Sequence, residues 1–459
     1  MLSKYIALTE KAHLHLNPGK NNLIYIRNET NATSLQMDDS LLTLNKTAAE
    51  ILTHCHGIYT GNEILTLLGN KYDVSDPFIY SSGAEHVIGQ LVEEGAAVLL
   101  DSPEYYKINI TGDFDYATPI HATVELLAQC NLRCAHCYRE ASPDIDDTMS
   151  LAHVKHVFST LRDHGVISVE LTGGEISIHP NFYEIVELAA KMFDIVGLLT
   201  NGTKITQKLL STLEPYKHKI VFSVSLDGPT AEVHEELRRV EGSFQKTCNG
   251  IRMISEAGFF VRAAMSVYNK NVWHIEDTLL LAKELGASLF GYSKVDPFGR
   301  GERLEMEVDV GKLEQIINYE KRIMDQYSDF IAVLSEEQIR NNNKTPNCGM
   351  GWKSVIVDPF GNVRPCVMLT PGMMDMGNLH HQSYREVFDS PLAHQLLNMV
   401  SPVKSELCSS DCSQKSYCRG CALRAIEANS HSEEACPWVK GNNLLEYTQK
   451  KKELQLQTH

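Results

Sequence analysis

The stretch Cys130-Asn131-Leu132-Arg133-Cys134-Ala135-His136-Cys137-Tyr138-Arg139 contains cysteines separated by three and then by two residues. It closely follows the apolar run Val124 to Leu127, which predicts the end of a β-strand. Three thiolates on one short loop can ligate three irons of a cubic iron–sulfur cluster and leave the fourth iron open. Since a small molecule can chelate an open iron, the spacing indicates a reactive centre.

Zinc and disulfides are the competing interpretations of this loop. A structural zinc site has four closed ligands, usually two pairs from separate loops, and a compact trio fits that pattern poorly. His136 lies inside the loop and not at a partner spacing. Disulfides would leave one of the three cysteines over, and nothing marks the chain as secreted. The loop therefore favours a cluster.

The Cys-x3-Cys-x2-Cys spacing after a first strand resembles the radical S-adenosylmethionine (SAM) superfamily. The resemblance implies that Cys130, Cys134 and Cys137 are the catalytic cluster ligands and that SAM chelates the fourth iron through its amino and carboxylate groups. It also implies that an electron from the cluster cleaves SAM into methionine and a 5′-deoxyadenosyl radical.

Composition excludes several classes of protein. The chain has 459 residues, an apolar share of 43% and a formal charge of −16, so we expect two or three domains with sizeable cores. Such an acidic chain argues against nucleic-acid binding. No apolar run is long enough to span a membrane, and no signal peptide is evident at residues 1–16, so we expect a cytoplasmic protein. Cys55 and Cys248 stand apart from the other cysteines and are expected to be buried thiols.

The first hundred residues predict a winged helix. Asn45 is a candidate helix cap, Thr60-x2-Glu63 forms a capping box, and Ala84 to Glu94 has a helical apolar face. Gly95 ends this third helix, and a short strand is expected at 97–100. The segment 44–57, the capping box and the ending 91–95 resemble the leader-peptide recognition element of ribosomal-peptide maturases.

That resemblance implies that residues 1–105 bind the leader of a precursor peptide, which adds a strand to the edge of the wing sheet and packs on the third helix. A DNA-binding winged helix is the alternative. It needs a basic surface, whereas the polar positions of the third helix include Glu85, Glu93 and Glu94.

From residue 118 to about 300, strands alternate with mostly helical stretches, which is the rhythm of parallel βα units. Six units predict an α/β fold with a partial (β/α)6 TIM-type barrel over 118–310, whose chemistry lies at the C-terminal ends of the strands. The expected strands are Thr123–Leu127, Ser168–Leu171, Val196–Thr200, Ile220–Leu226, Phe260–Val267 and Ser288–Val295.

Candidate SAM contacts fall at these strand ends. Gly173 and Gly174 let the backbone approach a ligand, and Glu175 resembles the family's contact to the SAM ammonium; a tight turn with a solvated carboxylate is the alternative. Ser225 or Asp227 is expected to bond the ribose, and Arg238 resembles the family's fork to the SAM carboxylate, with a solvated helix cation as the alternative. The complete assigned set is Tyr138, Gly173, Gly174, Glu175, Asn201, Ser225, Arg238 and Met265, of which Met265 is expected to pack on adenine unless it is plain core.

Seven cysteines gather near the C-terminus, and the segment 340–440 resembles the SPASM extension of radical SAM enzymes. Gly361 predicts a hairpin turn that brings Cys348 and Cys366 onto adjacent strands. The central spacing here is three, five, two, whereas the family's is two, five, three. The resemblance implies two auxiliary clusters, hence three [4Fe–4S] clusters in all, with the ligands Cys348, Cys366, Cys408, Cys412, Cys418, Cys421 and Cys436.

Two four-iron clusters need eight ligands, and this region has seven cysteines. The family's crossed pattern implies one cluster closed by four cysteines and another with an open iron. A substrate thiolate bound there would be deprotonated and fixed. A non-cysteine ligand, or zinc in place of one cluster, is the alternative. The closed set would be Cys408, Cys412, Cys418 and Cys436, and the open set Cys348, Cys366 and Cys421.

Longer strings narrow the resemblance to the branch of thioether-forming maturases typified by the subtilosin A enzyme. They include Thr172 to Ile176, Phe260 to Val267, Phe298 to Gly301, Asn347 to Ser354 and Val363 to Cys366. Members join a cysteine sulfur of a ribosomal precursor peptide to an α-carbon (sactipeptides) or a side-chain carbon (freyrasin-type ranthipeptides). The implied partners are that peptide and a reductant such as flavodoxin or ferredoxin.

Two other functions remain open on the sequence. Another radical peptide modification is one: epimerisation, carbon–carbon linking or formylglycine formation. Epimerisation would require a hydrogen donor such as Cys248. A zinc-bearing winged-helix regulator is the second, and it belongs to another class of protein.

Overall fold

The computed structural model describes residues 1–19, 21–26, 41–296, 298–304, 312–331, 347–369, 372–418, 420–432 and 434–450. The expected domain limits at 310 and 340 lie outside these ranges. The chain divides into two compact units, one of residues 1–120 with 163–165, and the other of residues 121–162 and 166–459.

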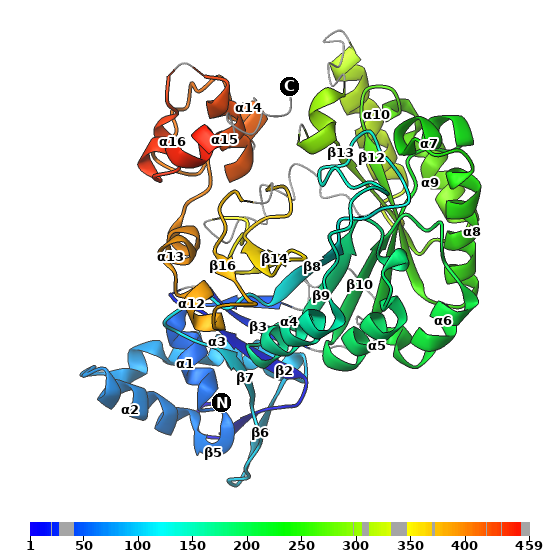
Figure 1. Ribbon diagram of the computed structural model, residues 1–459. Coiled ribbons are helices and arrows are strands. Elements are labelled where there is room, and N and C mark those ends of the chain that lie inside the picture. Colours follow the sequence, from blue (N-terminus) through cyan, green and yellow to red (C-terminus); the bar gives the residue numbers. More distant parts are fainter. Residues whose placement is uncertain are drawn as a thin grey trace. The chain divides into compact units, whose positions relative to one another are not determined.

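The first unit contains the expected three helices and two small sheets (Figure 1). Asn45 caps the first helix by accepting from the Ala48 amide, and Thr60 with Glu63 forms the capping box of the second, so both start signals are confirmed. The helices are α1 (Lys46–Thr53), α2 (Gly61–Lys71) and α3 (Ser81–Glu93), with a 3-10 turn η1 (Pro77–Tyr80) before α3.

The sheets of this unit contain strands that the sequence pattern did not indicate. One sheet has the order β5-β1-β6, and the other has the order β4-β3-β2-β7. Histidines interrupt the hydrophobicity of β2, although His15 is itself fully buried. The strands are β1 (Tyr5–Leu8), β2 (Ala12–Leu16), β3 (Asn22–Ile26), β4 (Leu41–Leu44), β5 (His56–Thr60), β6 (Ala97–Leu100) and β7 (Asn109–Gly112).

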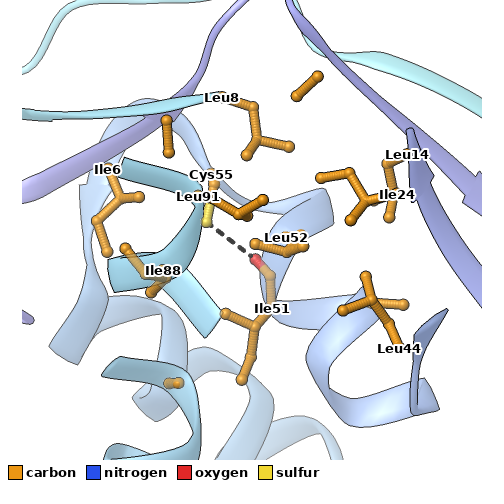
Figure 2. Packing of buried hydrophobic residues seen from close by; sticks show 14 of the residues in the cluster. Ile6, Leu8, Leu14, Ile24, Leu44, Ile51, Leu52, Cys55, Ile88 and Leu91 are labelled. Carbon is orange, nitrogen blue, oxygen red and sulfur yellow. Dashed lines mark hydrogen bonds between the residues drawn. The ribbon is translucent and has the colours of Figure 1, made fainter. Parts of the chain in front are cut away.

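An aliphatic core joins these helices and strands (Figure 2). Ile6, Leu14, Leu52 and Leu91 are each 0% exposed. Cys55 lies in the same core, where its thiol donates to the Ile51 carbonyl oxygen at 3.4 Å. Burial raises the pKa of Cys55 to about 12, which confirms that this cysteine is an ordinary buried thiol.

The second unit is built on a nine-stranded sheet of order β13-β12-β11-β10-β9-β8-β14-β15-β16. Its first six strands in the chain are parallel and in sequential order, as the alternating pattern predicts. Figure 1 shows the intervening helices along the outer side of these strands. The six are β8 (His121–Leu127), β9 (Ser168–Gly173), β10 (Ile195–Thr200), β11 (Ile220–Ser225), β12 (Phe260–Val267) and β13 (Leu289–Lys294).

The helices of this part follow the strands in turn. In chain order they are α4 (Leu151–Asp163), α5 (Phe182–Met192), α6 (Gln207–Leu213), α7 (Ala231–Arg238), α8 (Ser243–Glu256), α9 (Ile275–Glu284) and α10 (Leu313–Gln326). Short 3-10 turns are η2 (Ile176–Ile178), η3 (Glu214–Lys219), η4 (Val272–His274) and η5 (Gly299–Arg303).

The cysteine-rich segment continues the same sheet. Strand β14 pairs in parallel with β8, and β15 returns antiparallel to β14. The remaining elements are β14 (Ser354–Val357), β15 (Asn362–Arg364), β16 (Gly377–Asn378), α12 (Tyr384–Phe388), α13 (Pro391–Asn398), α14 (Lys415–Cys418), α15 (Ala422–Ser430) and α16 (Pro437–Gly441).

Candidate functional site

The three-cysteine loop begins where β8 ends. The side chains of Cys130 and Cys134 are buried, and Cys137 is half-buried. Burial raises the pKa of the Cys130 thiol to about 12, and the neighbouring Cys134 and Cys137 contribute to the same rise. The three thiols are thus close enough to interact electrostatically.

The backbone of this loop is held by α7 and by Arg300. The Ala135 amide donates to the Leu237 carbonyl oxygen at 2.8 Å. The Arg300 guanidinium donates to the carbonyl oxygens of Cys134 at 2.8 Å and Ala141 at 2.9 Å. Sequence reasoning missed this clamp, although the Phe298 to Gly301 string was part of the family resemblance. A loop held in this way keeps its thiols in a fixed arrangement.

Gly173 and Gly174 bring the end of β9 against the backbone leading into the loop. A Cβ at Gly174 would lie 1.9 Å from the Gln129 carbonyl oxygen, and one at Gly173 would lie 2.2 Å from that of Leu127. The Gly174 amide also donates to Leu127 O at 2.7 Å. The close approach predicted for these glycines is therefore made to the chain itself.

Glu175 is 1% exposed, so the alternative of a solvated carboxylate is wrong. Its Oε1 accepts from the Thr200 hydroxyl at 2.7 Å and from the Ser177 hydroxyl at 2.6 Å. Its Oε2 accepts from the Asn201 amide at 2.8 Å. These donors fix the carboxylate at the ends of β9 and β10, close enough to Cys130 to contribute to the raised pKa of that thiol.

Asn201 also joins the strand ends to the cysteine loop. Its side-chain amide donates to Asn131 Oδ1 at 2.9 Å, and Asn131 in turn donates to the Thr203 hydroxyl at 2.9 Å. The sequence placed Asn201 at this strand end but did not indicate its partner in the loop.

Arg238 is 7% exposed, which contradicts its alternative as a solvated helix cation. Its Nε donates to Asp227, and its Nη1 lies 3.5 Å from the sulfur of Cys134. The Ser266 amide donates to the other Asp227 oxygen at 2.8 Å. The Arg238 guanidinium holds the pKa of the Asp227 carboxyl below its usual range despite the opposing effect of burial. Each Asp227 oxygen thus already accepts from the protein, and a contact of this residue with the ribose stays a prediction.

Ser225 and Met265 lie on opposite faces of the sheet. Ser225 pairs with Ala264, whereas Met265 is the next residue along β12 and shares the face of Val261 and Ala263, both 0% exposed. Met265 is 2% exposed, a placement that favours plain core over adenine packing. As SAM contacts, both residues stay predictions.

Tyr138 lies beside the cluster loop and next to a buried charged group. Burial raises the pKa of its hydroxyl above the ordinary value, and the neighbouring Glu125 carboxylate adds to that rise. Its role toward SAM likewise stays a prediction.

The hairpin predicted at Gly361 is present. Gly361 has φ +85°, and its amide donates to Asp358 O at 2.9 Å between β14 and β15. The prediction that Cys348 and Cys366 lie on these strands is wrong, because β14 begins at Ser354 and β15 ends at Arg364. The cysteines flank the open end of the hairpin, where the irregular backbone leaves their thiols outside the ladder.

The C-terminal cysteines fall into two neighbourhoods. Burial raises the pKa of Cys366 to about 12, and Cys421 and Cys348 also contribute. Burial raises the pKa of Cys418 to about 11, and Cys436, Cys412 and Cys408 contribute, followed by Cys421. The structure therefore brings together the two sets that the family pattern implied, with Cys421 next to both. Their assignment as cluster ligands stays a prediction.

The surroundings of these thiols suit iron–sulfur clusters. The amides of Leu132, Met350 and Met368 each donate to the cysteine two residues earlier, namely Cys130, Cys348 and Cys366. Val403 N–H donates to Cys408 Sγ at 3.4 Å. Backbone N–H groups directed at sulfur stabilise bound thiolates and tune cluster potentials. Because burial raises the pKa of several of these thiols, iron binding must displace their protons.

Two family models match the chain. The radical SAM superfamily model matches residues 124–282, and the model described as an iron-sulfur cluster-binding domain, SPASM, matches residues 348–422. The antilisterial bacteriocin subtilosin biosynthesis protein AlbA of Bacillus subtilis (strain 168) is 37% identical over 447 residues, covering 96% of this chain and 98% of that protein. The chain belongs to the radical SAM/SPASM peptide maturases.

The residues fit the cofactors of this family, which are SAM and [4Fe–4S] clusters. The chain is a radical SAM enzyme, so the alternative of a zinc-bearing winged-helix regulator is wrong.

Solved structures share the fold of this enzyme. The structure of Streptococcus suis SuiB bound to S-adenosylmethionine has a TM-score of 0.62 and 16% identity, covering 94% of this chain and 98% of that one. SuiB bound to precursor peptide SuiA has a TM-score of 0.59 and 14% identity, covering 87% and 92%.

Within the part of the chain that the structure describes, no helix has both the length and the apolar character needed to cross a membrane.

Proposed function

We propose that this enzyme forms intramolecular thioethers in a ribosomally made peptide, joining a cysteine sulfur to the α-carbon or a side-chain carbon of an acceptor residue. One observation carries the proposal: Cys348 and Cys366 flank a hairpin in the same sheet as β8, which leads into the SAM-cluster loop, and Cys421 lies close to both thiols. Three thiols can hold a cluster with one iron open to a substrate sulfur.

The residues around the first loop bind and orient SAM in this proposal. Cys130, Cys134 and Cys137 would hold the cluster, Glu175 would bind the SAM ammonium, and Arg238 would bind the SAM carboxylate. The bound cluster and SAM supply the 5′-deoxyadenosyl radical that removes a hydrogen atom from the acceptor. Gly173, Gly174, Asn201, Ser225, Tyr138 and Met265 complete the proposed SAM site.

The second set of thiols determines where the peptide sulfur is held. Each link removes one hydrogen atom from the acceptor carbon, one proton from the cysteine thiol and one electron. Ligation to iron deprotonates a thiol, so no side-chain general base is required. The electron needs a redox centre, which the additional cysteine sets provide for.

The six parallel strands, in this proposal, form the partial (β/α)6 barrel over 118–310, followed by a SPASM domain at 340–440. Residues 1–105 form the winged-helix element that binds the leader. A one-electron donor such as flavodoxin or ferredoxin reduces the clusters, and the enzyme works in the cytoplasm.

The resemblance implied that the leader binds the wing sheet and the third helix; we propose instead that it extends the other sheet at β4. Among the described residues, β4 has a single strand neighbour, β3, and the proposal places the peptide strand along the other edge of β4. A pocket of about 210 Å³ begins directly after β4, lined by Lys46, Thr47, Ile51, Leu65 and Tyr72 among others. Backbone bonds to the strand give affinity, and such a pocket gives selectivity for one leader side chain.

Another radical peptide modification is less well supported. The hydrogen donor considered for epimerisation, Cys248, is 4% exposed on α8, and burial raises its pKa to about 11. A thiol in that position packs in the core.

Anaerobic co-expression with a small cysteine-rich peptide encoded nearby tests the proposal. The expected result is a peptide whose mass falls by two hydrogens per link and whose linked cysteines resist alkylation. Recovery of a peptide of unchanged mass would contradict thioether formation. So would an epimerised peptide whose only change in mass is the deuterium label.

A further inference from the structure

A buried carboxylate joins two arginines at the centre of the second unit. Glu125 Oε2 accepts from Arg139 Nη1 at 2.9 Å and from Arg364 Nη2 at 2.6 Å. The side chains of Glu125 and Arg364 are 0% exposed and that of Arg139 is 7% exposed. These three residues are called the Glu125 triad below.

The sheet register explains how residues so far apart in sequence meet. Ile356 on β14 pairs with Thr123 on β8 and with Arg364 on β15, so all three point to one face of the sheet. Glu125 lies two residues after Thr123 and therefore points to that same face. A long arginine side chain then spans the width of β14 to reach the carboxylate.

Each arginine of the triad stands two residues from a cysteine of a different set. Arg139 follows Cys137, which belongs to the SAM-cluster loop, and Arg364 precedes Cys366, which belongs to the set proposed to hold the substrate sulfur. Glu125 itself lies on β8, the strand that leads into the loop. The triad is thus a direct, buried connection between the two cysteine sets.

The composition of the triad is unusual for a purely stabilising ion pair. Two guanidinium groups share one carboxylate, so the triad by itself carries one excess positive charge, which is costly in a buried place. The carboxyl groups of Asp358 and Asp375 lie within electrostatic reach of Glu125 and Arg364, respectively. Three of its atoms, Glu125 Oε1, Arg139 Nε and Arg364 Nε, are buried without a hydrogen-bond partner among the described residues. Excess positive charge and spare N–H donors both suit the vicinity of anionic iron–sulfur clusters.

We propose that Glu125 is a positioning residue that fixes the SAM-cluster loop and the Cys366 end of the auxiliary site relative to each other, and that the triad's charge sets the potentials of both clusters. The inference rests on the proposed function. The inference adds that this carboxylate couples SAM cleavage to sulfur–carbon bond formation. An outer residue that orients metal ligands typically affects affinity or activity by about 10–100-fold.

The test compares Glu125→Gln with Glu276→Gln in the full-length, cluster-loaded enzyme. Glu276 is a matched control because it also pairs with an arginine, Arg322, at 2.7 Å, but there the glutamate is only half-buried and the arginine is exposed. The yield of thioether per 5′-deoxyadenosine should fall about tenfold or more in Glu125→Gln and stay unchanged in the control. Iron and sulfide content should match the wild type in both variants. The lower yield then reflects weaker coupling of SAM cleavage to thioether formation and not the loss of a cluster.

Redox titration followed by electron paramagnetic resonance gives a readout that does not depend on turnover. Glu125→Gln raises the net positive charge near both clusters and should raise both midpoint potentials, whereas Arg364→Met should lower that of the auxiliary cluster. Unchanged potentials together with wild-type coupling in a loaded Glu125→Gln enzyme would overturn the inference. If the wild type makes no thioether, the proposed function fails, while the potential shifts still test the triad.

A neutral replacement covers the case in which Glu125→Gln does not fold. The triple variant Glu125→Leu, Arg139→Met, Arg364→Met removes all three buried charges, an exchange that proteins often tolerate. It should fold and bind clusters, yet produce 5′-deoxyadenosine with about tenfold less thioether. Wild-type coupling in this variant would show that the triad serves packing alone and would overturn the inference.

Discussion

The two cysteine regions of this enzyme reach their geometry by different routes. Cys130, Cys134 and Cys137 lie within one loop, which backbone and side-chain bonds from α7, Asn201 and Arg300 hold in place. The C-terminal cysteines are spread from 348 to 436 and are brought together by a hairpin and the short helices α14, α15 and α16. The first site is encoded locally, whereas the second exists only once the segment has folded.

This difference matches the chemistry proposed for each region. SAM cleavage needs a cluster in one fixed geometry, and the clamped loop supplies it. Sulfur capture needs a site that an external peptide can enter. Accordingly, Cys348 is exposed and Cys366 half-buried, whereas Cys130 and Cys134 are buried.

Removal of a loop cysteine should have the largest effect. In Cys134→Ala the SAM cluster loses one of its three protein ligands, so production of 5′-deoxyadenosine should fall by more than the roughly 100-fold expected for an outer-shell residue. The 5′-deoxyadenosine formed in reactions with dithionite and SAM is measured by chromatography. Near-normal SAM cleavage in this variant would contradict the local encoding of the first site.

Removal of an auxiliary cysteine should separate the two activities. Cys366→Ala should leave SAM cleavage within about twofold, because all three proposed ligands of the SAM cluster remain in place, and should abolish thioether formation. Peptide mass and 5′-deoxyadenosine are measured in the same reaction. A linked peptide at wild-type yield would show that sulfur capture does not use this cysteine set.

Loss of the loop clamp should give an intermediate effect. Arg300→Met removes two hydrogen bonds to carbonyl oxygens, each worth about 1.5–3 kcal/mol when the donor is charged. We expect about 10–100-fold slower SAM cleavage, with part of the activity restored in Arg300→Lys. The exposed Arg322→Met is the control. Equal rates of SAM cleavage in Arg300→Met and the control would show that the loop keeps its structure without Arg300.

A fall in pH should destabilise the first unit through His15, which lies outside both cysteine regions. Burial lowers the pKa of His15 to about 4, so the folded unit rejects a proton that the unfolded chain accepts near pH 6.5. The contribution of neutral His15 to the free energy of unfolding of this unit is therefore fully present above pH 6.5. It is lost as the pH falls toward 4, by up to about 3 kcal/mol.

Hydrogen exchange of peptides from residues 1–120 at pH 7 and pH 5 measures this loss. His15→Gln should flatten the pH dependence of the wild type by about 2 kcal/mol at pH 5. The same slope in both proteins would exclude His15 as its source.

The sequence predicted the parts of the fold that depend on local pattern. All six parallel strands lie within two residues of the expected positions, because their apolar runs are short and bounded by turns and helices. Both helix start signals at Asn45 and Thr60 were correct for the same reason. Strand β2 was missed because its histidines hide a buried strand.

The sequence pattern did not predict the long-range contacts. The Arg300 clamp, the Asn201–Asn131 bond and the Glu125 triad each join residues separated by at least seventy positions or by several strands. The bond from Arg238 to Asp227 likewise becomes visible only when α7 brings the arginine back to the end of β11. Such partners follow from register and packing.

The most direct test of the central claim is a single anaerobic reaction of enzyme, SAM, reductant and the cysteine-containing precursor, with peptide mass and 5′-deoxyadenosine read together. The account predicts that the wild type yields 5′-deoxyadenosine and a peptide lighter by two hydrogens per link, and that Cys366→Ala yields 5′-deoxyadenosine alone. A linked peptide from Cys366→Ala, or no 5′-deoxyadenosine from the cluster-loaded wild type, would contradict it.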